Sequence, residues 1–592
     1  MEVDMFYYTS ERNAQIVISL LKAHGIKKVI ASPGTTSICL VSSMQRDPFF
    51  EMYSAPEERS AAYMACGLAV ESGEPVVITC TGATASRNYF SGLTEAFYRK
   101  IPVLAITCSR RNSRIGHNFD QVTDRTQLPK DVAKLSVQVP VVLDDEIEWA
   151  DTIAVNKALL ELTHHSKGPV HINLETEYST DYSVKNLPPT RVIRRISGND
   201  EFPPLPAGRI VIFVGSHDRW SAELTEAVDD FCSACNAVVL SDLLGNYKGK
   251  FGIPANLTAQ QSYRKSVLLE HDDLVIHLGN VHAPAFPFNV SSVWRVNPDG
   301  ELRDTFRKLE YVFEMEEVDF FRHYADLQDK KVHNDSLFEL CRAEEEQCYS
   351  ELKSKVGELP FSNAWIASQT AERLPENSVI HFGIQNSLRF WNFFHVPQSV
   401  CCYCNTGGFG IDGSISSAIG ASLANPDRLY YCVLGDLAFF YDLNSLGNRH
   451  VGKNLRIILI NNGKGTEFKL TGNPGHLFGQ ATDEFIAAAG HYGNKSHSLV
   501  KHFAEDLGFK YFGVSNKQEY LQIRDEVVSP GCSAQSILVE VFTNSEDEDS
   551  ALKFLHEICM SAAGTVTKKA KETIKEVIGN ETIAALRRMM GK

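Results

Sequence analysis

Residues 428–462 read RLYYCVLGDLAFFYDLNSLGNRHVGKNLRIILINN, in which two strand-like apolar runs each end in polar residues. Asp436 follows the first run after a glycine, and Asn461 and Asn462 follow the second. We expect two neighbouring strands of an open α/β sheet, because such sheets bind ligands beyond the carboxyl ends of their strands. A carboxylate, an amide oxygen and a backbone carbonyl are hard oxygen ligands that suit Mg²⁺ holding a phosphate. The stretch predicts a magnesium site made by Asp436, an amide oxygen of the Asn461–Asn462 pair and a backbone carbonyl of the glycine-rich turn that follows.

The same alternation of apolar runs and helix-like stretches extends along the chain. KKVIASPG, PVVITCTG, GRIVIFVGS, DDLVIHLGN and SVIHFGI are among the runs bounded by turn residues. This pattern is typical of parallel strands joined by crossover helices. A proline-rich stretch at 184–208 is the expected linker. We predict an α/β protein of three Rossmann-like, doubly wound domains at 1–185, 186–355 and 356–545, followed by a basic helical tail at 546–592.

Composition limits the classes of partner. The 592 residues carry a net charge of −15, which argues against sequence-independent nucleic-acid binding. No apolar run approaches the length of a membrane span, and no signal peptide is evident at the N-terminus, so we expect a cytoplasmic protein that acts on small molecules. A self-packing helical hairpin is favoured for the basic tail over a membrane-surface or partner-binding helix.

The cysteine and glycine patterns assign no further cofactor. The fourteen cysteines are expected to be reduced thiols in cores and strands. Cys232 and Cys235 form one CxxC pair, but no second pair follows at zinc-finger spacing. The central domain shows no GxGxxG at a strand-helix junction, so FAD or NAD binding has no support in the sequence.

The GD and NN positions resemble the GDG…NN signature of thiamine diphosphate (ThDP) enzymes, in which Asp and Asn hold Mg²⁺ on the cofactor's diphosphate. Leu437 stands where most of the superfamily has the second glycine. GDLAFFYDLNSL and NNGKGTEF are similar to one branch, the menaquinone-pathway carboligases known as SEPHCHC synthases. The resemblance implies that Asp436, Asn462 and the backbone carbonyl of Lys464 hold Mg²⁺. It also implies a homodimer or homotetramer whose active sites lie between subunits.

A second signature of that superfamily lies in the first domain. In YSAPEERSAAYMACGLAVESGEPVVITCTG, Glu58 stands nine residues before Gly67. The resemblance implies that Glu58 lies beside the pyrimidine ring of ThDP, where burial would raise its pKa. Adjacent Glu57 is expected to be a solvated or capping residue. His117 is our candidate for proton transfer to the acceptor, although a satisfied loop histidine is the simpler interpretation, and Gln121 is expected to line the active site.

Other segments resemble the family in order and spacing. Ile411 falls where the family places the apolar wedge that bends the cofactor, although a plain core role is the alternative. The residues expected to contact the cofactor are Gly34, Thr84, Asn88, Ser387, Gly410, Ile411, Gly435, Leu437, Ala438, Gly465 and Thr466.

The substrate pocket departs from this branch. The branch joins 2-oxoglutarate to isochorismate, and arginine is the natural partner of such carboxylates. Thr36, Thr406 and Trp391 occupy three positions at which the branch has arginine, whereas Arg110 is kept and Arg389 lies one helical turn from the expected place. The residues expected to contact substrate are Thr36, Arg110, Arg389, Thr406, Glu467 and Phe468.

The sequence therefore predicts an Mg²⁺/ThDP-dependent lyase or carboligase that decarboxylates a 2-oxo acid and joins the product to an acceptor. The missing arginines favour a less anionic acceptor, such as a sugar or polyol derivative. The alternatives are a SEPHCHC synthase with relocated arginines, a simple 2-oxo acid decarboxylase, and a catalytically silent scaffold with the ThDP fold.

Overall fold

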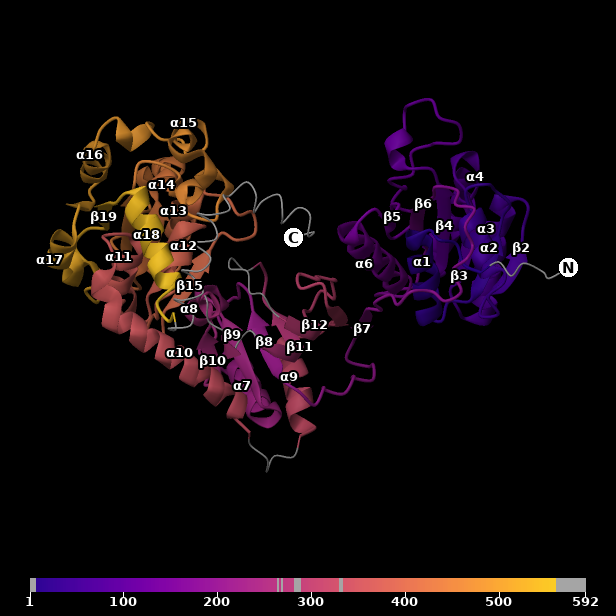
Figure 1. Ribbon diagram of the computed structural model, residues 1–592, viewed down its shortest axis with the longest axis horizontal. Coiled ribbons are helices and arrows are strands. Elements are labelled where there is room, and N and C mark those ends of the chain that lie inside the picture. The colour runs from indigo at the N-terminus through magenta and orange to yellow at the C-terminus, as the bar shows by residue number, and fades with distance from the viewer. Residues whose placement is uncertain (1–6, 263–265, 268–269, 282–288, 329–333, 561–592) are drawn as a thin grey trace, which may run out of the picture. The chain divides into compact units, whose positions relative to one another are not determined.

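The computed structural model describes residues 7–262, 266–267, 270–281, 289–328 and 334–560. The chain forms two compact units, each of which is described by itself (Figure 1). Met1–Glu201 and Gly300–Glu314 make the first unit, and Phe202–Asp299 and Met315–Lys592 make the second. No helix in the described ranges has both the length and the apolar character needed to span a bilayer.

The first unit is built on a six-stranded parallel sheet with the order β2-β1-β3-β4-β6-β5. Its strands are β1 (Lys28–Ala31), β2 (Glu51–Ser54), β3 (Val76–Thr81), β4 (Val103–Ser109), β5 (Ser136–Val139) and β6 (Val170–Glu175). Its helices are α1 (Arg12–Ala23), α2 (Ile38–Met44), α3 (Glu58–Ser72), α4 (Ala83–Asn88), α5 (Phe90–Arg99) and α6 (Asp145–Glu161). The short strands β7 (Arg194–Ile196) and β13 (Leu309–Phe313) pair in parallel within this unit.

Both faces of this sheet are covered, which explains its continuous apolar strands. Every residue of β4 and β6 is buried. One core cluster joins the sheet to α1, α2 and α6, and another joins it to α3 and α5. Parallel strands buried on two faces carry apolar residues at successive positions rather than at alternate ones.

Asp151 of α6 is a buried carboxyl group with an expected effect on stability. It is 1% exposed, and its Oδ2 has no hydrogen-bond partner. Burial, with repulsion from Glu175 and Glu148, raises the pKa of Asp151 from 3.8 to about 8. Between about pH 4 and pH 8, Asp151 therefore stays mainly protonated in the folded chain and is mainly ionised in the unfolded chain.

We expect Asp151→Asn to remove this pH-dependent loss of stability. The wild-type chain should lose up to ~1.4 kcal/mol per pH unit relative to the variant as pH rises through this window. Urea unfolding of both proteins at pH 5 and pH 8 measures the difference. Equal changes in the two unfolding midpoints would contradict the assigned protonation state.

The second unit contains a central sheet with the parallel strand order β10-β9-β8-β11-β12. Its strands are β8 (Ile210–Val214), β9 (Ala237–Ser241), β10 (Gly252–Pro254), β11 (His271–Leu278) and β12 (Asn289–Val296). The accompanying helices are α7 (Ala222–Cys235), α8 (Asn256–Ala259), α9 (Glu317–Asp326) and α10 (Ser336–Lys355). Two backbone hydrogen bonds join the carboxyl ends of β8 and β11. Gly215 donates its N–H to the carbonyl of Leu278, and Asn280 donates its N–H to the carbonyl of Ser216.

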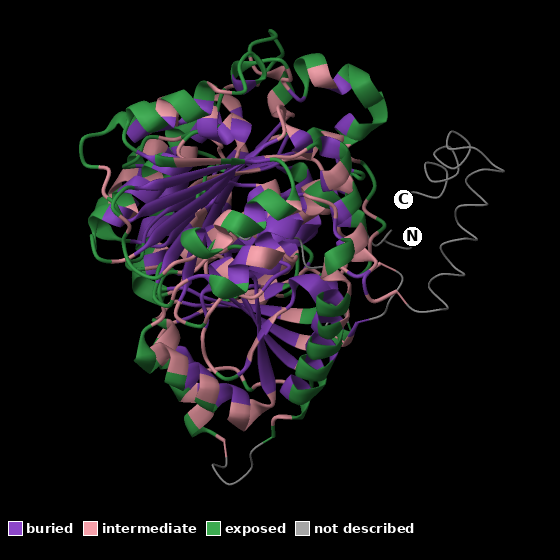
Figure 2. Ribbon diagram, turned by 90° about the vertical axis from the view of Figure 1, so that its left-hand side faces the viewer, coloured by how far each residue is buried: buried purple, intermediate pink, exposed green. Residues whose placement is uncertain are grey.

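The other sheet of the second unit has the order β15-β14-β16-β17-β19-β18, which repeats the topology of the first unit's sheet. Its strands are β14 (Val379–Phe382), β15 (Cys401–Cys404), β16 (Tyr430–Gly435), β17 (Leu455–Asn461), β18 (Lys510–Val514) and β19 (Ile537–Phe542). Its helices are α11 (Asn363–Thr370), α12 (Asn386–Trp391), α13 (Ser414–Leu423), α14 (Asp436–Tyr441), α15 (Thr482–Phe485), α16 (Leu499–Asp506), α17 (Lys517–Val527) and α18 (Ser545–His556). Figure 2 shows the buried strands of this unit between helices that are exposed on their outer sides.

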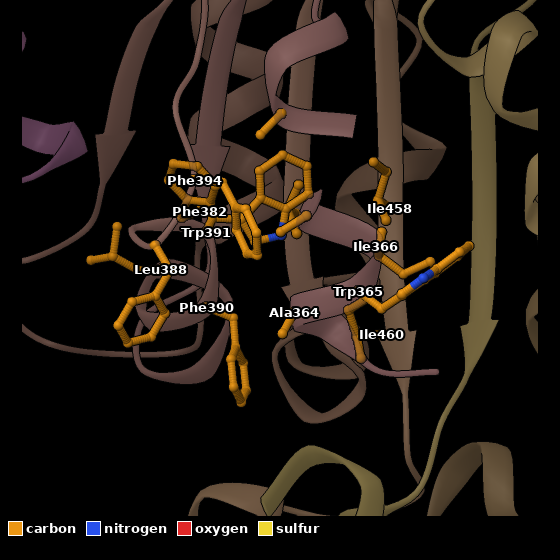
Figure 3. Packing of buried hydrophobic residues seen from close by; sticks show 14 of the residues in the cluster. Ala364, Trp365, Ile366, Phe382, Leu388, Phe390, Trp391, Phe394, Ile458 and Ile460 are labelled. Atoms are coloured by element: carbon orange, nitrogen blue, oxygen red, sulfur yellow. The ribbon is translucent and has the colours of Figure 1, made fainter. Parts of the chain in front are cut away.

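An aromatic core joins the last sheet to α11 and α12. Trp391 is fully buried and donates its indole N–H to Asn363 Oδ1 at 3.1 Å. Figure 3 shows it packed among Phe382, Phe394 and neighbouring apolar side chains. The core thus anchors the end of α12, the helix that also carries Ser387 and Arg389.

Two local predictions need correction. Leu443 and Leu446 in the sequence predict that an amphipathic helix starts there, but the helix begins at Asp436 instead, and Leu443–Gly447 forms a 3₁₀ turn. Part of the predicted tail belongs to the core: in α18, Leu552 and Leu555 are buried and Glu548 accepts the backbone N–H of Asn363. The rest of that tail, 561–592, lies outside the described residues.

Candidate cofactor and metal site

Asp436 is a buried carboxylate at the carboxyl edge of the last sheet. It follows β16 and is 4% exposed. Burial raises the pKa of Asp436 to about 7, and repulsion from Glu540 acts in the same direction. Within the described ranges, no Lys or Arg side chain forms an ion pair with it. A carboxylate buried without a cation is costly, so this position fits a bound metal ion.

Asn462 supplies the second oxygen at this edge. Its Oδ1 is buried and has no hydrogen-bond partner, whereas neighbouring Asn461 donates its amide to Glu540 Oε1 at 2.6 Å. The strand register places Gly435 beside Ile460, so Asp436 and Asn461 leave neighbouring strands at the same level. An unpartnered amide oxygen beside an unpaired carboxylate is the donor set that Mg²⁺ prefers.

Lys464 lies in the turn after Asn462, where its backbone carbonyl is the candidate ligand. Its ammonium group is held by Asp483 at 2.7 Å, and Lys469 pairs with the same carboxylate, so the side chain is not simply solvated. The carbonyl of Lys464 accepts the N–H of Thr466 at 2.9 Å. Thr466 Oγ1 is a second buried oxygen without a partner. The turn therefore offers polar groups that a diphosphate and its metal ion would satisfy.

The turn also packs closely against α14. A Cβ added to Gly465 would lie 3.1 Å from a ring carbon of Phe468 and 3.3 Å from Leu437. Asn494 donates its amide to the carbonyl of Gly463, which has a positive φ of 76°. Leu437, Gly465 and Phe468 thus lie together beside the candidate metal ligands.

The remaining cofactor positions of the second unit lie near the same strands. Ser387 is buried in α12, and Ala438 is buried in α14. Gly410 precedes Ile411, which is half-buried and packs against both core clusters of this sheet. The core role and the cofactor role proposed for Ile411 are therefore compatible.

Arg389 and Glu467 form a bidentate ion pair, here called the Arg389–Glu467 fork. Arg389 Nη1 donates to Glu467 Oε2 at 2.5 Å, and Nη2 donates to Oε1 at 3.1 Å. Asn386 and Gln385 accept further bonds from the same guanidinium. Glu467 thus occupies the place that a substrate carboxylate would take on this arginine.

The three positions that lack the branch's arginine hold buried side chains. Thr36 donates its hydroxyl to the carbonyl of Cys108 at 2.6 Å. Thr406 donates to Ser216 Oγ at 3.3 Å, and Trp391 is part of the aromatic core. None of these three presents a charge to a substrate.

In the first unit, Glu58 is the first residue of α3. Asn88 donates its side-chain amide to Glu58 Oε2 at 3.0 Å. Glu57 accepts the N–H groups of Arg59 and Ser60, which confirms its predicted capping role. Glu58 itself is only partly buried, so the burial expected for it is not reached within one chain.

The other first-unit positions are less enclosed. Thr84 is exposed on α4, whereas Gly34 packs tightly against Thr81. Arg110 donates to the Tyr178 hydroxyl at 2.9 Å and to Asp120 at 3.1 Å. His117 and Gln121 are exposed in the loop after β4.

Arg125 is a buried residue of this loop that the sequence did not single out. It is 1% exposed and donates to Asn173 Oδ1 at 3.2 Å and to Thr123 Oγ1 at 2.7 Å. Its Nη2 has no partner, and a Cβ on Gly82 would approach Nη1 to 3.0 Å. Burial lowers the pKa of Arg125 below its usual value. Nothing in the sequence around Arg125 indicates that this arginine is buried, because it lies in a polar loop.

Two parts of the chain match models of known protein domains. Residues 12–128 match the N-terminal TPP binding domain of thiamine pyrophosphate enzymes, and residues 385–533 match the C-terminal TPP binding domain. The chain belongs to the thiamine pyrophosphate (ThDP) enzymes, a class that uses Mg²⁺ with this cofactor.

Several relatives carry the name 2-succinyl-5-enolpyruvyl-6-hydroxy-3-cyclohexene-1-carboxylate (SEPHCHC) synthase, including the following three. The relative from Bacteroides thetaiotaomicron is 31% identical and covers 93% of this chain and 99% of its own length. The Bacteroides fragilis relative is 31% identical over 93% of this chain and all of its own. The Flavobacterium johnsoniae relative is 27% identical over 91% and 97%.

These relatives confirm the predicted enzyme class and fold and the predicted resemblance to this branch. They support a carboligase role. They do not support the sugar or polyol acceptor, and they favour the SEPHCHC synthase alternative over it.

Proposed function

We propose that the chain is a decarboxylative carboligase that uses 2-oxoglutarate as donor and isochorismate as acceptor. The observation that carries the proposal is the buried, unpaired Asp436 beside the unpartnered Oδ1 of Asn462, in a chain whose full-length relatives are named SEPHCHC synthases. Fold alone would not name the substrates.

The chain's own residues would hold and orient the cofactor. Asp436, Asn462 and the carbonyl of Lys464 would hold Mg²⁺, and half-buried Ile411 would support the bent shape of ThDP. Glu58, oriented by Asn88, would hydrogen-bond to the pyrimidine ring. Bound ThDP supplies the electron sink for decarboxylation and carbon–carbon bond formation.

Recognition of carboxylates would rest on relocated arginines. Thr36, Thr406 and Trp391 offer no charge, so Arg389 becomes the principal candidate in the second unit. Its fork with Glu467 would be the resting state, and a substrate carboxylate would replace the Glu467 carboxylate on the guanidinium. Arg110 of the first unit would provide a second cation.

Variants of the fork test this recognition. Arg389→Met should raise the KM for 2-oxoglutarate about 10- to 100-fold, because a charge-assisted bond of about 1.5–3 kcal/mol is lost. Glu467→Gln should lower this KM, because the guanidinium loses its internal competitor. Steady-state kinetics give both values.

Arg373→Met is the matched control, because Arg373 is an exposed arginine in the same unit. It should leave the KM unchanged. A KM for Arg389→Met equal to that of the control would remove Arg389 from substrate recognition.

The substrate pair is tested by assaying CO₂ release and product mass. We expect CO₂ release from 2-oxoglutarate to require isochorismate and to accompany a joined product of the mass expected for SEPHCHC. CO₂ release without any acceptor would favour the simple decarboxylase. Failure to bind ThDP and to consume any 2-oxo acid in a donor panel would favour the silent scaffold.

We also propose a homodimer, or a dimer of dimers, in which Glu58 and Asp436 of one site come from different chains. The resemblance implies this arrangement, and the partial exposure of Glu58 supports it. Tyr63, Met64 and Val70 of α3 are about half exposed, an apolar surface that a second copy would cover.

Mixing two inactive variants tests the shared site. Glu58→Gln and Asp436→Asn chains, dissociated together and reassociated, should recover about a quarter of wild-type activity, because half of the dimers are hybrids with one intact site of two. Each variant reassociated alone is the control. No recovery in confirmed hybrids would place both residues of a site in one chain.

A further inference from the structure

A cluster of metal-ligating side chains lies in the first unit, outside the residues assigned to the cofactor and substrates. His164 and His165 follow the end of α6, and Glu314 follows β13. His164 Nε2 lies 3.1 Å from Glu314 Oε2, and His165 Nε2 lies 3.4 Å from Glu314 Oε1. One ligand atom from each residue lies within 4.8 Å of the other two. The three residues can therefore face one ion.

The local backbone places both rings toward the same carboxylate. His165 has a φ of 52°, in the left-handed region that a residue with a Cβ seldom adopts. The two imidazole rings stack with centroids 3.8 Å apart and an angle of 30° between their planes. A regular helix would direct successive side chains about 100° apart. The turn thus brings the two Nε2 atoms to one side.

We propose that His164, His165 and Glu314 bind Zn²⁺. Two histidines and a carboxylate form a ligand set that zinc accepts, with a fourth position left for water. Zinc–nitrogen and zinc–oxygen distances of about 2.0–2.2 Å in a tetrahedron separate neighbouring ligand atoms by about 3.3–3.5 Å. The separations of 3.1 and 3.4 Å end on different oxygens of Glu314 and are close to this spacing, so binding through one of these oxygens would need a small shift of the side chains.

The surroundings of His164 support this assignment. Its other ring nitrogen, Nδ1, lies 3.0 Å from Glu161 Oε2, and Lys134 holds Glu161 at 3.2 Å. Histidine ligands of zinc commonly donate this second N–H to a carboxylate, which fixes the ring and its tautomer. Glu161 would therefore orient His164 without touching the ion.

The charges around Glu314 are compatible with a cation. Arg195 Nε lies 3.8 Å from Glu314 Oε2, but Arg195 donates its hydrogen bond to the carbonyl of Gly300 at 3.0 Å. Glu314 is thus not captured in a close arginine fork. Without the metal, Glu314 accepts a hydrogen bond from His164 Nε2 at 3.1 Å and lies 3.4 Å from His165 Nε2.

A zinc ion here would join distant segments of the first unit. His164 and Glu314 are 150 residues apart in the sequence. Binding a ligand set that exists only in the folded chain would stabilise the unit against unfolding. The proposed role is structural and is independent of the proposed function.

Zinc titration of the holoenzyme tests the site. With excess Mg²⁺ and ThDP present to fill the cofactor site, Zn²⁺ is titrated in competition with a chromogenic chelator. We expect the wild type to bind one more equivalent per chain than His165→Ala or Glu314→Gln. The side chain of His165 is 73% exposed, so its removal should leave folding intact. Glu161→Gln should keep the stoichiometry and weaken binding about 10- to 100-fold.

His502→Ala, which removes an exposed histidine of α16, is the matched control and should bind as the wild type does. Co²⁺ provides a second readout, because a tetrahedral site gives visible absorption that His165→Ala should lose. Equal zinc stoichiometry in wild type, His165→Ala and Glu314→Gln would overturn the proposal, as would a Co²⁺ spectrum unchanged by His165→Ala.

Discussion

Glu58→Gln should lower turnover at least ~100-fold while the affinity for ThDP changes little. General acid–base assistance typically contributes 10²- to 10⁴-fold, and an amide cannot exchange the proton that a carboxyl group exchanges. Gln keeps the size of the side chain and an oxygen that can accept the Asn88 bond, so the start of α3 should remain in place. Cofactor titration followed by single-turnover CO₂ release separates binding from chemistry.

The neighbouring residue supplies the control. Glu57 caps the same helix through the N–H groups of Arg59 and Ser60. Glu57→Gln should lower stability slightly, because the helix cap is weakened, and should leave turnover nearly unchanged. Full activity of Glu58→Gln, or equal losses in both variants, would contradict the role proposed for Glu58.

Asp436→Asn should weaken Mg²⁺-dependent ThDP binding at least ~100-fold, since the ion loses its only charged ligand in the predicted set. The same change should not destabilise the cofactor-free chain. Burial raises the pKa of Asp436 to about 7, so a neutral amide removes an unfavourable ionisation at neutral pH. ThDP titrations with and without Mg²⁺, and thermal unfolding of the cofactor-free proteins, measure the two effects.

Asp442 is the matched control for Asp436. It is also buried beside α14, but its carboxylate accepts two bonds from Ser416, each of 2.6 Å. Asp442→Asn should therefore lower stability without a selective loss of Mg²⁺ dependence. A strong loss of stability in Asp436→Asn, with cofactor affinity retained, would assign Asp436 a structural role instead.

The central strands were predictable and the edge strands were not. Runs such as YYCVL and LRIILI became β16 and β17, because strands covered on both faces need apolar residues throughout. The edge strand β2 reads EMYS and is partly exposed, and β18 reads KYFGV with mainly exposed or half-buried residues. Short edge strands have one neighbour and little burial, so their sequences resemble those of loops.

Some residues of the candidate site were likewise predictable from the sequence, and others were not. The signature residues Asp436, Asn462 and Glu58 were found from spacing and resemblance, because cofactor chemistry requires those residue types at those strand and helix ends. The pairing of Arg389 with Glu467 joins residues 78 positions apart, and no local pattern indicates it. The buried state of Arg125 likewise depends on Asn173 and Gly82, which come from other segments.

By itself, the sequence determined the alternating α/β architecture, the enzyme class and the polar residues that end the strands, because these depend on periodicity and on residue chemistry over short spans. Only the tertiary structure decided which charges are neutralised, which stay buried without an opposite charge, and that α18 belongs to a core. Burial and pairing are set by contacts between segments far apart in the chain, and the free energy of a charge depends on those surroundings rather than on its neighbours in sequence.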